Sequence, residues 1–354
     1  MSRIPDIQHL LGTNAVDAAL LTHPPDVRWA CGFTGSNGML VVQPSGAHLV
    51  TDGRYAEQAA DEVRGASVDA PGYDLIGYVA ERGWLGEGAR VLIQGDRVTV
   101  AERDGWAERL PGCTLVPRTR WMAPARAAKT AAEVEQIRTA QAVTDAVFGE
   151  IVGLLRPGVT EREVAAEIVY RHLLRGADKM AFDPIVASGP QGALPHARPT
   201  DRVLQSGELV VLDFGCVLGG YASDMTRTVA LGEPGDEARA AYAVVLRAQR
   251  QALAAARSGI TTNALDAAAR GVIEDAGLGS FFSHGLGHGI GLETHEWPHV
   301  SRHTDAVMPA GTTVTIEPGV YLPGRFGIRI EDIVVLRQDG CENLTAAPKD
   351  LLVL

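Results

Sequence analysis

Cysteines are few in this sequence, and no segment is typical of an exported or membrane-bound protein. The four cysteines of its 354 residues are scattered and form no CxxC pair, so they do not indicate a disulfide framework. No apolar run reaches the roughly 18 residues that a membrane span needs. The first residues also lack the basic start and unbroken apolar stretch of a signal peptide. A cytoplasmic protein without membrane contacts is therefore predicted.

The sequence has no long basic run either. Lys and Arg number 32 against 43 Asp and Glu, which gives a formal net charge of −11. A surface that binds nucleic-acid phosphates needs an excess of basic over acidic residues. Nucleic acid is therefore not expected as a partner.

Length and composition indicate a folded chain with two domains. Hydrophobic residues make up 46% and charged residues 21%, which is ordinary for a globular protein. A chain of 354 residues exceeds the usual size of one hydrophobic core. The Pro- and Ala-rich segment from Trp121 to Lys129 places the boundary near residue 122, with domains at 1–122 and 123–354.

The first domain alternates helix and strand patterns, as an α/β fold does. Residues 38–55 contain two apolar runs around a Pro-Ser-Gly turn, which predicts a hairpin. Residues 89–96, ARVLIQGD, predict a buried strand.

The second domain has helices in blocks between strand pairs, which indicates an α+β fold. Apolar residues recur every three or four positions from Thr130 to about Leu155, and this spacing predicts an amphipathic helix. Thr160 and Glu163 resemble a capping box that opens the next helix. Further helices are predicted at 236–257 and 262–276, and strands at 207–215, 225–232, 312–321 and 328–336.

Asp213 ends an apolar strand-like run, and Glu317 and Glu331 interrupt two further strand-like runs. Asp213 and Asp224 flank a Gly-Gly turn, and Glu317 and Glu331 flank Pro-Gly turns, as the legs of two hairpins would. Buried carboxylates are costly unless they are ion-paired or bound to metal, and few basic residues lie in these segments. The pattern therefore predicts one pocket that contains Asp213, Asp224, Glu317 and Glu331.

Three of the ten histidines lie among glycines in the segment HGLGHGIGLETHE at 284–296. An HxxxH pair on a helix would indicate zinc, but Gly285 and Gly287 disfavour a helix. The spacing also differs from the GxGxxG of dinucleotide loops, and no βαβ unit surrounds it. The kinase-like DFG at 213–215 likewise stands without the other kinase motifs. A loop or strand that brings His288 to the carboxylates is predicted.

Four carboxylates and one imidazole make a hard, oxygen-rich set of ligands. Such a set favours Mn²⁺, with Co²⁺, Fe²⁺ or Zn²⁺ able to substitute. Four anionic ligands suggest two divalent metal ions, which could share a hydroxide and polarise a carbonyl. Hydrolysis is therefore the predicted reaction class.

Several segments together resemble the proline-specific metallopeptidases of the pita-bread fold, namely aminopeptidase P, prolidase and, more distantly, methionine aminopeptidase. The first 122 residues are similar to the creatinase-type N-terminal domain of the first two. The resemblance implies a C-terminal pita-bread metallopeptidase domain after a smaller α/β domain, and a homodimer. The matching segments are GFTGSNG at 32–38, TDGRY at 51–55, SDMTRT at 223–228, HGLGHGIGLETHE at 284–296, EPGVY at 317–321 and IRIED at 328–332.

The resemblance implies a role for each metal ligand. Asp213 would bind one metal ion, and Asp224 and Glu331 would bridge both. His288 and Glu317 would bind the other ion, and Glu317 would also carry the proton of the bridging water.

It also implies roles for three further histidines and one arginine. His196, His284 and His295 would polarise the scissile carbonyl, stabilise the oxyanion and position the proline end. Arg329 would orient a bridging carboxylate without binding metal. By contrast, His299 and His303 are interpreted as solvated loop residues.

The implied substrates are peptides with proline at position two, cut before that proline. Removal of the first residue from longer peptides, as by aminopeptidase P, is the first choice, and hydrolysis of the Xaa-Pro dipeptide, as by prolidase, is the alternative. Retention of all five ligands disfavours a creatinase-like hydrolase or a metal-free binding relative. Residues 32–38 and 51–55 could either line the substrate entrance or serve only the N-terminal fold.

Overall fold

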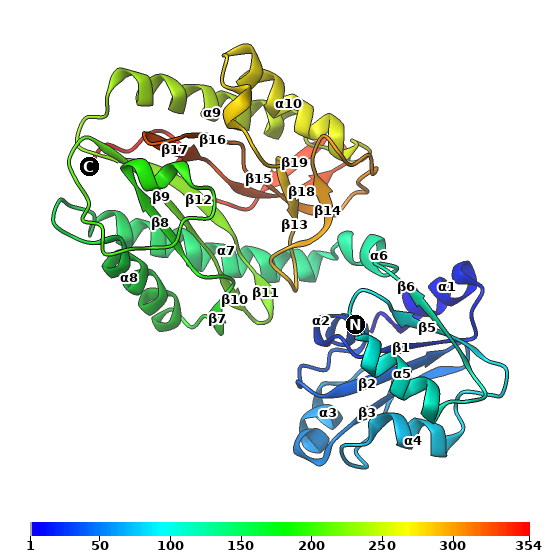
Figure 1. Cartoon of the computed structure of the whole chain (residues 1–354). Helices are drawn as coiled ribbons and strands as arrows, with labels where there is room; N and C mark the ends of the chain where they lie inside the picture. Colours follow the sequence, from blue (N-terminus) through cyan, green and yellow to red (C-terminus); the bar gives the residue numbers. More distant parts are fainter. Residues whose placement is uncertain (1) are drawn as a thin grey trace. The chain divides into compact units, whose positions relative to one another are not determined.

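The computed structural model describes residues 2–354, which form two compact units divided between Arg126 and Ala127 (Figure 1). Each unit has its own sheets and core. In the first unit the helices are α1 (Ile4–Asn14), α2 (Pro24–Cys31), α3 (Ala56–Glu62), α4 (Leu75–Arg82), α5 (Val100–Arg109) and α6 (Ala123–Ala127), which ends at the division. The strands are β1 (Ala18–Leu21), β2 (Gly38–Gln43), β3 (Gly46–Thr51), β4 (Ser67–Asp69), β5 (Arg90–Gln94) and β6 (Thr114–Arg118).

The first unit is built on a mixed sheet with the order β4-β3-β2-β1-β5-β6. The predicted hairpin is confirmed, since β2 and β3 pair antiparallel from Gly38↔Thr51 to Gln43↔Gly46. The predicted strand at ARVLIQGD is confirmed as β5, which pairs parallel with β1 and β6. Helices α4 and α5 contribute buried residues such as Val79 and Trp106 to the core on this sheet.

The GFTGSNG and TDGRY segments contact one another inside the first unit. The Asn37 amide donates to the buried Asp52 carboxylate at 2.7 Å, and the Ser36 and Tyr55 hydroxyls lie 2.7 Å apart. Asp52 also accepts from Arg54. These contacts support a structural role, while a role at a substrate entrance stays a prediction.

The second unit contains four long helices and most of the strands. Its helices are α7 (Ala131–Val152), α8 (Glu161–Leu174), α9 (Asp236–Ala255) and α10 (Thr262–Asp275). Its strands are β7 (Lys179–Met180), β8 (Ile185–Ser188), β9 (Glu208–Phe214), β10 (Cys216–Leu218), β11 (Tyr221–Ala222), β12 (Met225–Leu231), β13 (Gly287–Gly289), β14 (Glu296–Val300), β15 (Thr313–Ile316), β16 (Gly319–Leu322), β17 (Phe326–Arg329), β18 (Asp332–Arg337) and β19 (Gly340–Asn343).

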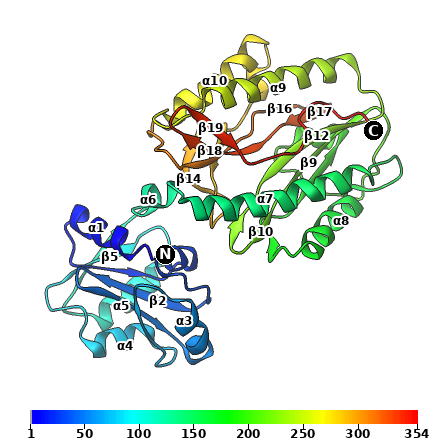
Figure 2. The same cartoon turned by 180° about the vertical axis from the view of Figure 1, so that it is seen from behind.

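All four predicted helices of this unit are confirmed, and they cover the strands in two layers. Thr130 and Thr160 each form a complete capping box, with Glu133 and Glu163 respectively. Figures 1 and 2 show α7 and α8 on one side of the strands and α9 and α10 on the other. The α+β class follows from this arrangement.

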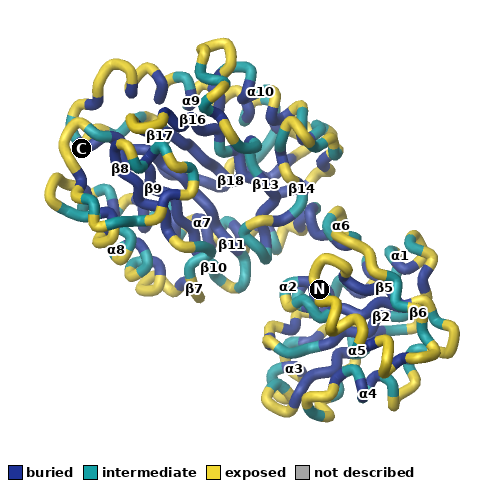
Figure 3. The backbone as a smooth tube through the Cα atoms, in the orientation of Figure 1, coloured by how far each residue is buried: buried dark blue, intermediate teal, exposed yellow. Residues whose placement is uncertain are grey.

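Each helix layer has its own core against the strands, and the buried backbone in Figure 3 follows these strands. On the α7 and α8 side, Phe148 and Ile168 pack with Leu212 and Met225. On the α9 and α10 side, Val245 packs in the cluster that contains Val314 and Val334. The strands are therefore apolar on both faces, so a polar group between them must find a partner or bind a ligand.

Among residues 2–354, no helix combines the length and the apolar character that crossing a membrane requires.

His172 on α8 makes the stability of this unit depend on pH. Its ring is fully buried against Phe214, Nδ1 lies 2.8 Å from the Ile168 carbonyl oxygen, and burial lowers its pKa. Below the ordinary histidine pKa of about 6.5 the unfolded chain binds a proton that the folded state disfavours, so stability is lost as pH falls.

We expect the melting temperature of the parent protein to fall more between about pH 7.5 and pH 5.5 than that of His172→Phe. Differential scanning calorimetry at both pH values checks this difference. Equal falls in the two proteins would contradict it.

Candidate metal centre

One cavity of about 540 Å³ in the second unit is lined by every residue that the sequence proposed for the site. The nine side chains come from separate strands and loops. They are His196, Asp213, Asp224, His284, His288, His295, Glu317, Arg329 and Glu331.

The first two carboxylates are brought together by β9 and β12. These strands pair antiparallel with Asp213 opposite Thr226, so Asp224 lies just before the paired segment. The predicted turn is the tip of the short β10–β11 hairpin, where Gly219 and Gly220 have φ of +55° and +79°. Such positive φ values at two successive residues suit glycine in a tight hairpin turn.

Glu317 and Glu331 are placed in the same manner. Strand β15 pairs antiparallel with β18, with Ile316 opposite Asp332. Glu317 follows the first strand and Glu331 precedes the second, so both carboxylates lie at one end of this pair. The β16–β17 hairpin forms the connection.

His288 occupies the centre of the short strand β13, as the loop-or-strand interpretation allowed. A Cβ on Gly287 would lie 2.1 Å from the Thr315 carbonyl oxygen, so the glycine permits the close approach of β13 to β15. His288 Nδ1 lies 3.0 Å from the Gly289 carbonyl oxygen, to which it can donate. Nε2 then carries the lone pair, and it lies 3.7 Å from Asp224 and 3.4 Å from Glu317.

Asp213 and Glu331 are held by a shared set of donors. Arg329 Nη2 donates to Asp213 Oδ2 at 2.5 Å, and its Nε donates to Thr226 Oγ1 at 2.9 Å. Thr226 in turn donates to Glu331 Oε2 at 2.7 Å. Asp213 Oδ1 is buried and has no hydrogen-bond partner among residues 2–354.

This set of donors fits a divalent metal ion. One ligand atom from each of Asp224, His288 and Glu331 lies within 4.8 Å of the others, and all three residues are buried. Asp213 Oδ1, which has no hydrogen-bond partner in the described chain, is a further ligand atom. Carboxylate oxygens and a neutral imidazole are suitable ligands for such ions.

The carboxylates carry charge that the protein alone does not neutralise. Burial raises the pKa of Asp224 well above its ordinary value, and the carboxylates of Glu331 and Asp213 raise it further. Burial also raises the pKa of Glu331 and of Glu317. Cations at the centre would offset this repulsion.

His284 belongs to a hydrogen-bonded chain that the sequence did not predict. His284 Nε2 lies 2.9 Å from the Tyr321 hydroxyl, and Arg329 Nη1 donates to the same hydroxyl at 2.7 Å. Tyr321 ends the EPGVY segment, but tyrosine is common in strands, so the motif alone did not mark its contact. The chain connects one histidine of the cavity to the arginine that holds Asp213.

The His295 ring lies beside the His288 ring, with 4.3 Å between the ring centroids. Burial, with the nearby His288, lowers its pKa to about 4, so its ring is neutral at physiological pH. The next residue, Glu296, accepts from Lys129 Nζ at 2.8 Å, and both side chains are almost fully buried. This ion pair fixes the backbone beside His295.

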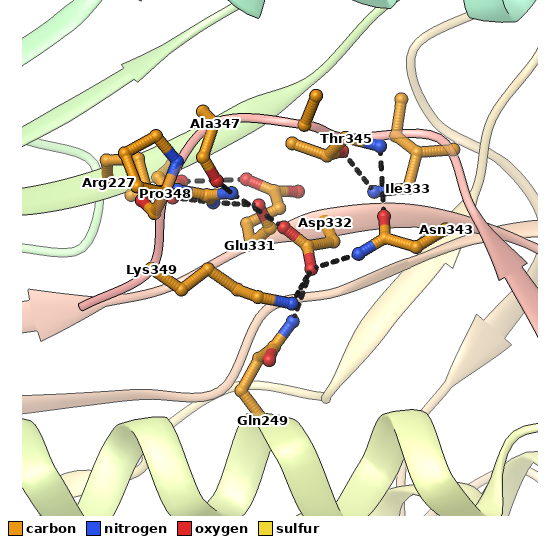
Figure 4. Close-up of polar contacts among 12 residues, drawn as sticks. Arg227, Gln249, Glu331, Asp332, Ile333, Asn343, Thr345, Ala347, Pro348 and Lys349 are labelled. Carbon is orange, nitrogen blue, oxygen red and sulfur yellow. Dashed lines mark hydrogen bonds and ion pairs between the residues drawn. The ribbon is translucent and has the colours of Figure 1, made fainter.

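A polar cluster lies behind Glu331, between the strands and α9 (Figure 4). Arg227 Nη1 donates to the Glu331 carbonyl oxygen at 2.6 Å, and Nη2 donates to Asp332 at 2.8 Å. Asp332 also accepts from Lys349 and Gln249. The sequence gave no sign of this role for Arg227, because its partners come from segments far along the chain.

The remaining wall of the cavity is apolar with two exposed charges. Phe182, Ile185 and Val300 supply apolar surface, while Asp183 and Arg198 are charged. The interpretation of His299 as a solvated loop residue is wrong: it is exposed, but it lies on strand β14 and lines this wall of the cavity.

Each unit matches the model of a known protein family. Residues 135–338 match the model described as Metallopeptidase family M24. Residues 3–128 match the model described as Creatinase/Prolidase N-terminal domain.

The chain is also similar to individual proteins. It is 43% identical to a Xaa-Pro dipeptidase of Pyrococcus furiosus over 227 residues, which are 64% of this chain and 65% of that protein. The solved structure of a Xaa-Pro dipeptidase from Bacillus anthracis has a TM-score of 0.96 and 35% identity, and the match covers 99% of both chains. An X-Pro aminopeptidase from Thermotoga maritima has a TM-score of 0.91 and 36% identity, covering 98% of this chain and 100% of that one.

Proposed function

Because this chain belongs to metallopeptidase family M24, we propose that it is a Xaa-Pro dipeptidase that uses two divalent metal ions. The observation that carries the proposal is the cavity in which four carboxylates and one imidazole converge, with an oxygen of Asp213 that has no partner in the described part of the chain. Such a set of donors is typical of a hydrolytic metal centre.

The sequence favoured removal of the first residue from longer peptides, with the dipeptidase as its alternative. Two of the three relatives described above are Xaa-Pro dipeptidases, and one of them is similar over 99% of both chains. The larger share of dipeptidases among these relatives supports the dipeptidase alternative. The aminopeptidase stays the second candidate because the Thermotoga maritima protein is similar at 36% identity.

We assign Asp213, Asp224, His288, Glu317 and Glu331 as the residues that would hold the two ions, with Asp224 and Glu331 contributing to both. Oxygen-rich coordination favours Mn²⁺, with Co²⁺, Fe²⁺ or Zn²⁺ able to substitute. When bound, such ions would act as Lewis acids that make a water more acidic and polarise the scissile carbonyl.

Glu317 is the group that we assign to proton transfer. Burial raises the pKa of its carboxyl group, which therefore holds a proton more readily than an exposed glutamate. Thr315 Oγ1 donates to Glu317 Oε1 at 3.2 Å and orients it. A carboxylate in this position can take the proton of the attacking water and pass it to the nitrogen of the leaving proline.

Three histidines of the cavity act on the substrate itself. His295 is neutral, and a ring N–H can donate to the oxygen of the tetrahedral intermediate. His284 is oriented by the Tyr321 hydroxyl, and His196 is exposed on the wall where the proline end would lie. Phe182, Ile185 and Val300 offer the apolar surface that a proline ring needs.

The proposed function is tested with the purified chain after removal of metal by a chelator and reloading with Mn²⁺. A Xaa-Pro dipeptide should be cleaved by the reloaded protein and not by the metal-free protein. A Xaa-Pro-Xaa tripeptide should be cleaved much more slowly, and a Xaa-Ala dipeptide serves as the control for proline. Preferential cleavage of the tripeptide would support the aminopeptidase instead, and no cleavage of either proline substrate would refute both.

Two histidine variants should separate metal binding from catalysis. His288→Ala should lose metal and activity together, since Nε2 faces the carboxylates. His295→Ala should keep its metal and lose about 10²–10³-fold in kcat, the usual effect of removing one oxyanion donor. Metal analysis by mass spectrometry and steady-state kinetics check both results.

The control is His303→Ala, because His303 is exposed and does not line the cavity. A His295→Ala protein that retained full kcat would show that His295 has no role in the reaction.

A further inference from the structure

The cavity wall contains two arginines and no lysine among the described residues. Arg329 is already fully engaged. Its Nε and Nη2 donate to Thr226 and Asp213, and its Nη1 donates to the Tyr321 hydroxyl and the Pro195 carbonyl oxygen. Each nitrogen of its guanidinium therefore already donates to a protein oxygen.

Arg198 is the other arginine of the wall, and it differs from Arg329 in its exposure and in its lack of protein partners. Its side chain is exposed, and it makes no hydrogen bond or ion pair with any residue between 2 and 354. It follows His196 by two positions on the same loop. The guanidinium is therefore free to meet a ligand in the cavity.

The loop that carries Arg198 is anchored at both ends. The Pro195 carbonyl oxygen accepts from Arg329 Nη1 at 3.3 Å, and Ala197 is buried. The fully buried Glu161 accepts from the backbone N–H and the hydroxyl of Thr200 at 3.0 and 2.7 Å. A fixed loop lowers the entropy that binding through Arg198 would otherwise cost.

The substrate of a Xaa-Pro dipeptidase brings a further negative charge into this cavity. The two divalent ions would offset the four acidic ligands, so the C-terminal carboxylate of the substrate needs a positive partner of its own on the wall. An ionised carboxylate that leaves water needs a charged partner or several hydrogen bonds. The histidines on the wall do not carry a permanent charge, whereas a guanidinium does, and it can donate two parallel hydrogen bonds to one carboxylate.

We propose that Arg198 binds the C-terminal carboxylate of the Xaa-Pro dipeptide and thereby selects dipeptides over longer or amidated peptides. This inference rests on the proposed function and names the group that distinguishes dipeptides from longer peptides. Asp183, the exposed acid on the same wall, would repel that carboxylate, so it makes the contribution of Arg198 more necessary.

The experiment compares a Xaa-Pro dipeptide with its C-terminal amide, which lacks the charge. The Mn²⁺-loaded full chain should prefer the acid by about tenfold or more in kcat/KM, as expected for a charge-assisted hydrogen bond. Arg198→Gln should raise KM for the acid by about 10- to 100-fold, with kcat within about twofold and the amide unaffected. The preference for the acid should then disappear, and Arg198→Lys should restore part of it.

Arg162→Gln is the matched control, because Arg162 is an exposed arginine of the same unit that pairs with Asp201 and lies outside the cavity. Equal metal content and melting temperature in all variants show that each is folded. Cleavage by the parent protein with the acid preference unchanged in Arg198→Gln would overturn the inference alone. No cleavage of either substrate by the loaded parent protein would overturn the proposed function as well.

Discussion

Replacing Glu331 with glutamine is expected to remove bound metal and to lower kcat for the Xaa-Pro dipeptide by about a thousandfold. A catalytic metal ion contributes several kcal/mol to the transition state, and each ~1.4 kcal/mol is a factor of ten in rate. Glu331 is buried, and Thr226 aligns one of its oxygens. The amide keeps this hydrogen bond but loses the negative charge that would bridge two cations.

The same variant should have the opposite effect on the metal-free protein. The folded-state pKa of Glu331 is raised by burial and by the carboxylates of Glu317 and Asp213, so its ionised form costs stability above its ordinary pKa. Glutamine removes this cost. The melting temperature of metal-free Glu331→Gln should therefore exceed that of the metal-free parent, whereas added Mn²⁺ should stabilise the parent more.

Metal analysis, steady-state kinetics and calorimetry with and without a chelator measure these three effects. Glu274→Gln is the control, since Glu274 is an exposed residue of α10. If Glu331→Gln bound two metal ions with undiminished affinity, Glu331 would not be a bridging ligand.

The second large effect is expected from Arg227→Met, which should lower the free energy of unfolding by about 3–5 kcal/mol. The guanidinium is almost fully buried and donates to the carbonyl oxygens of Thr226, Glu331, Ala347 and Pro348 as well as to Asp332. Removing it takes one hydrogen bond from each of these acceptors and leaves Asp332 with one fewer positive partner. The Thr226 carbonyl oxygen still accepts from the Glu331 N–H. Figure 4 shows that the cluster joins the strand after Glu331 to the C-terminal segment.

Denaturant unfolding of the metal-loaded protein measures this loss. Arg239→Met is the control, because Arg239 forms an exposed ion pair with Glu233, and such pairs contribute at most about 1 kcal/mol. A loss below about 1 kcal/mol in Arg227→Met would show that the cluster does not stabilise the fold.

The elements with a strong local signal were predicted well. Helix α7 starts at its Thr130 capping box, and the β2–β3 hairpin forms around the Pro-Ser-Gly turn, because these signals depend on neighbouring residues. The strand-like segment 312–321 is instead two strands, β15 and β16, interrupted at Glu317 and Pro318. Proline lacks the N–H that a continuous ladder needs, so the interruption coincides with the carboxylate.

The pairs of carboxylates were also readable from the sequence, since two antiparallel strand pairs place the ends of their legs together. Contacts between distant segments could not be predicted from the sequence. Lys129 and Glu296 form a buried ion pair across most of the second unit's sequence, and Arg227 meets residues more than a hundred positions away. Neither partner has a local pattern that points to the other.

The sequence by itself determined which residue types could form an anionic, metal-binding cavity, because carboxylates that interrupt apolar strands are costly without a cation. Only the tertiary structure decided how those groups are supported. It placed Arg329 beside Asp213 and Thr226 beside Glu331. Within residues 2–354 it also left one oxygen of Asp213 and the Arg198 guanidinium on the cavity wall without a partner. The reason is that charge and strand pattern are local properties, whereas the partner of a buried group is whichever distant segment the packing brings within hydrogen-bonding distance.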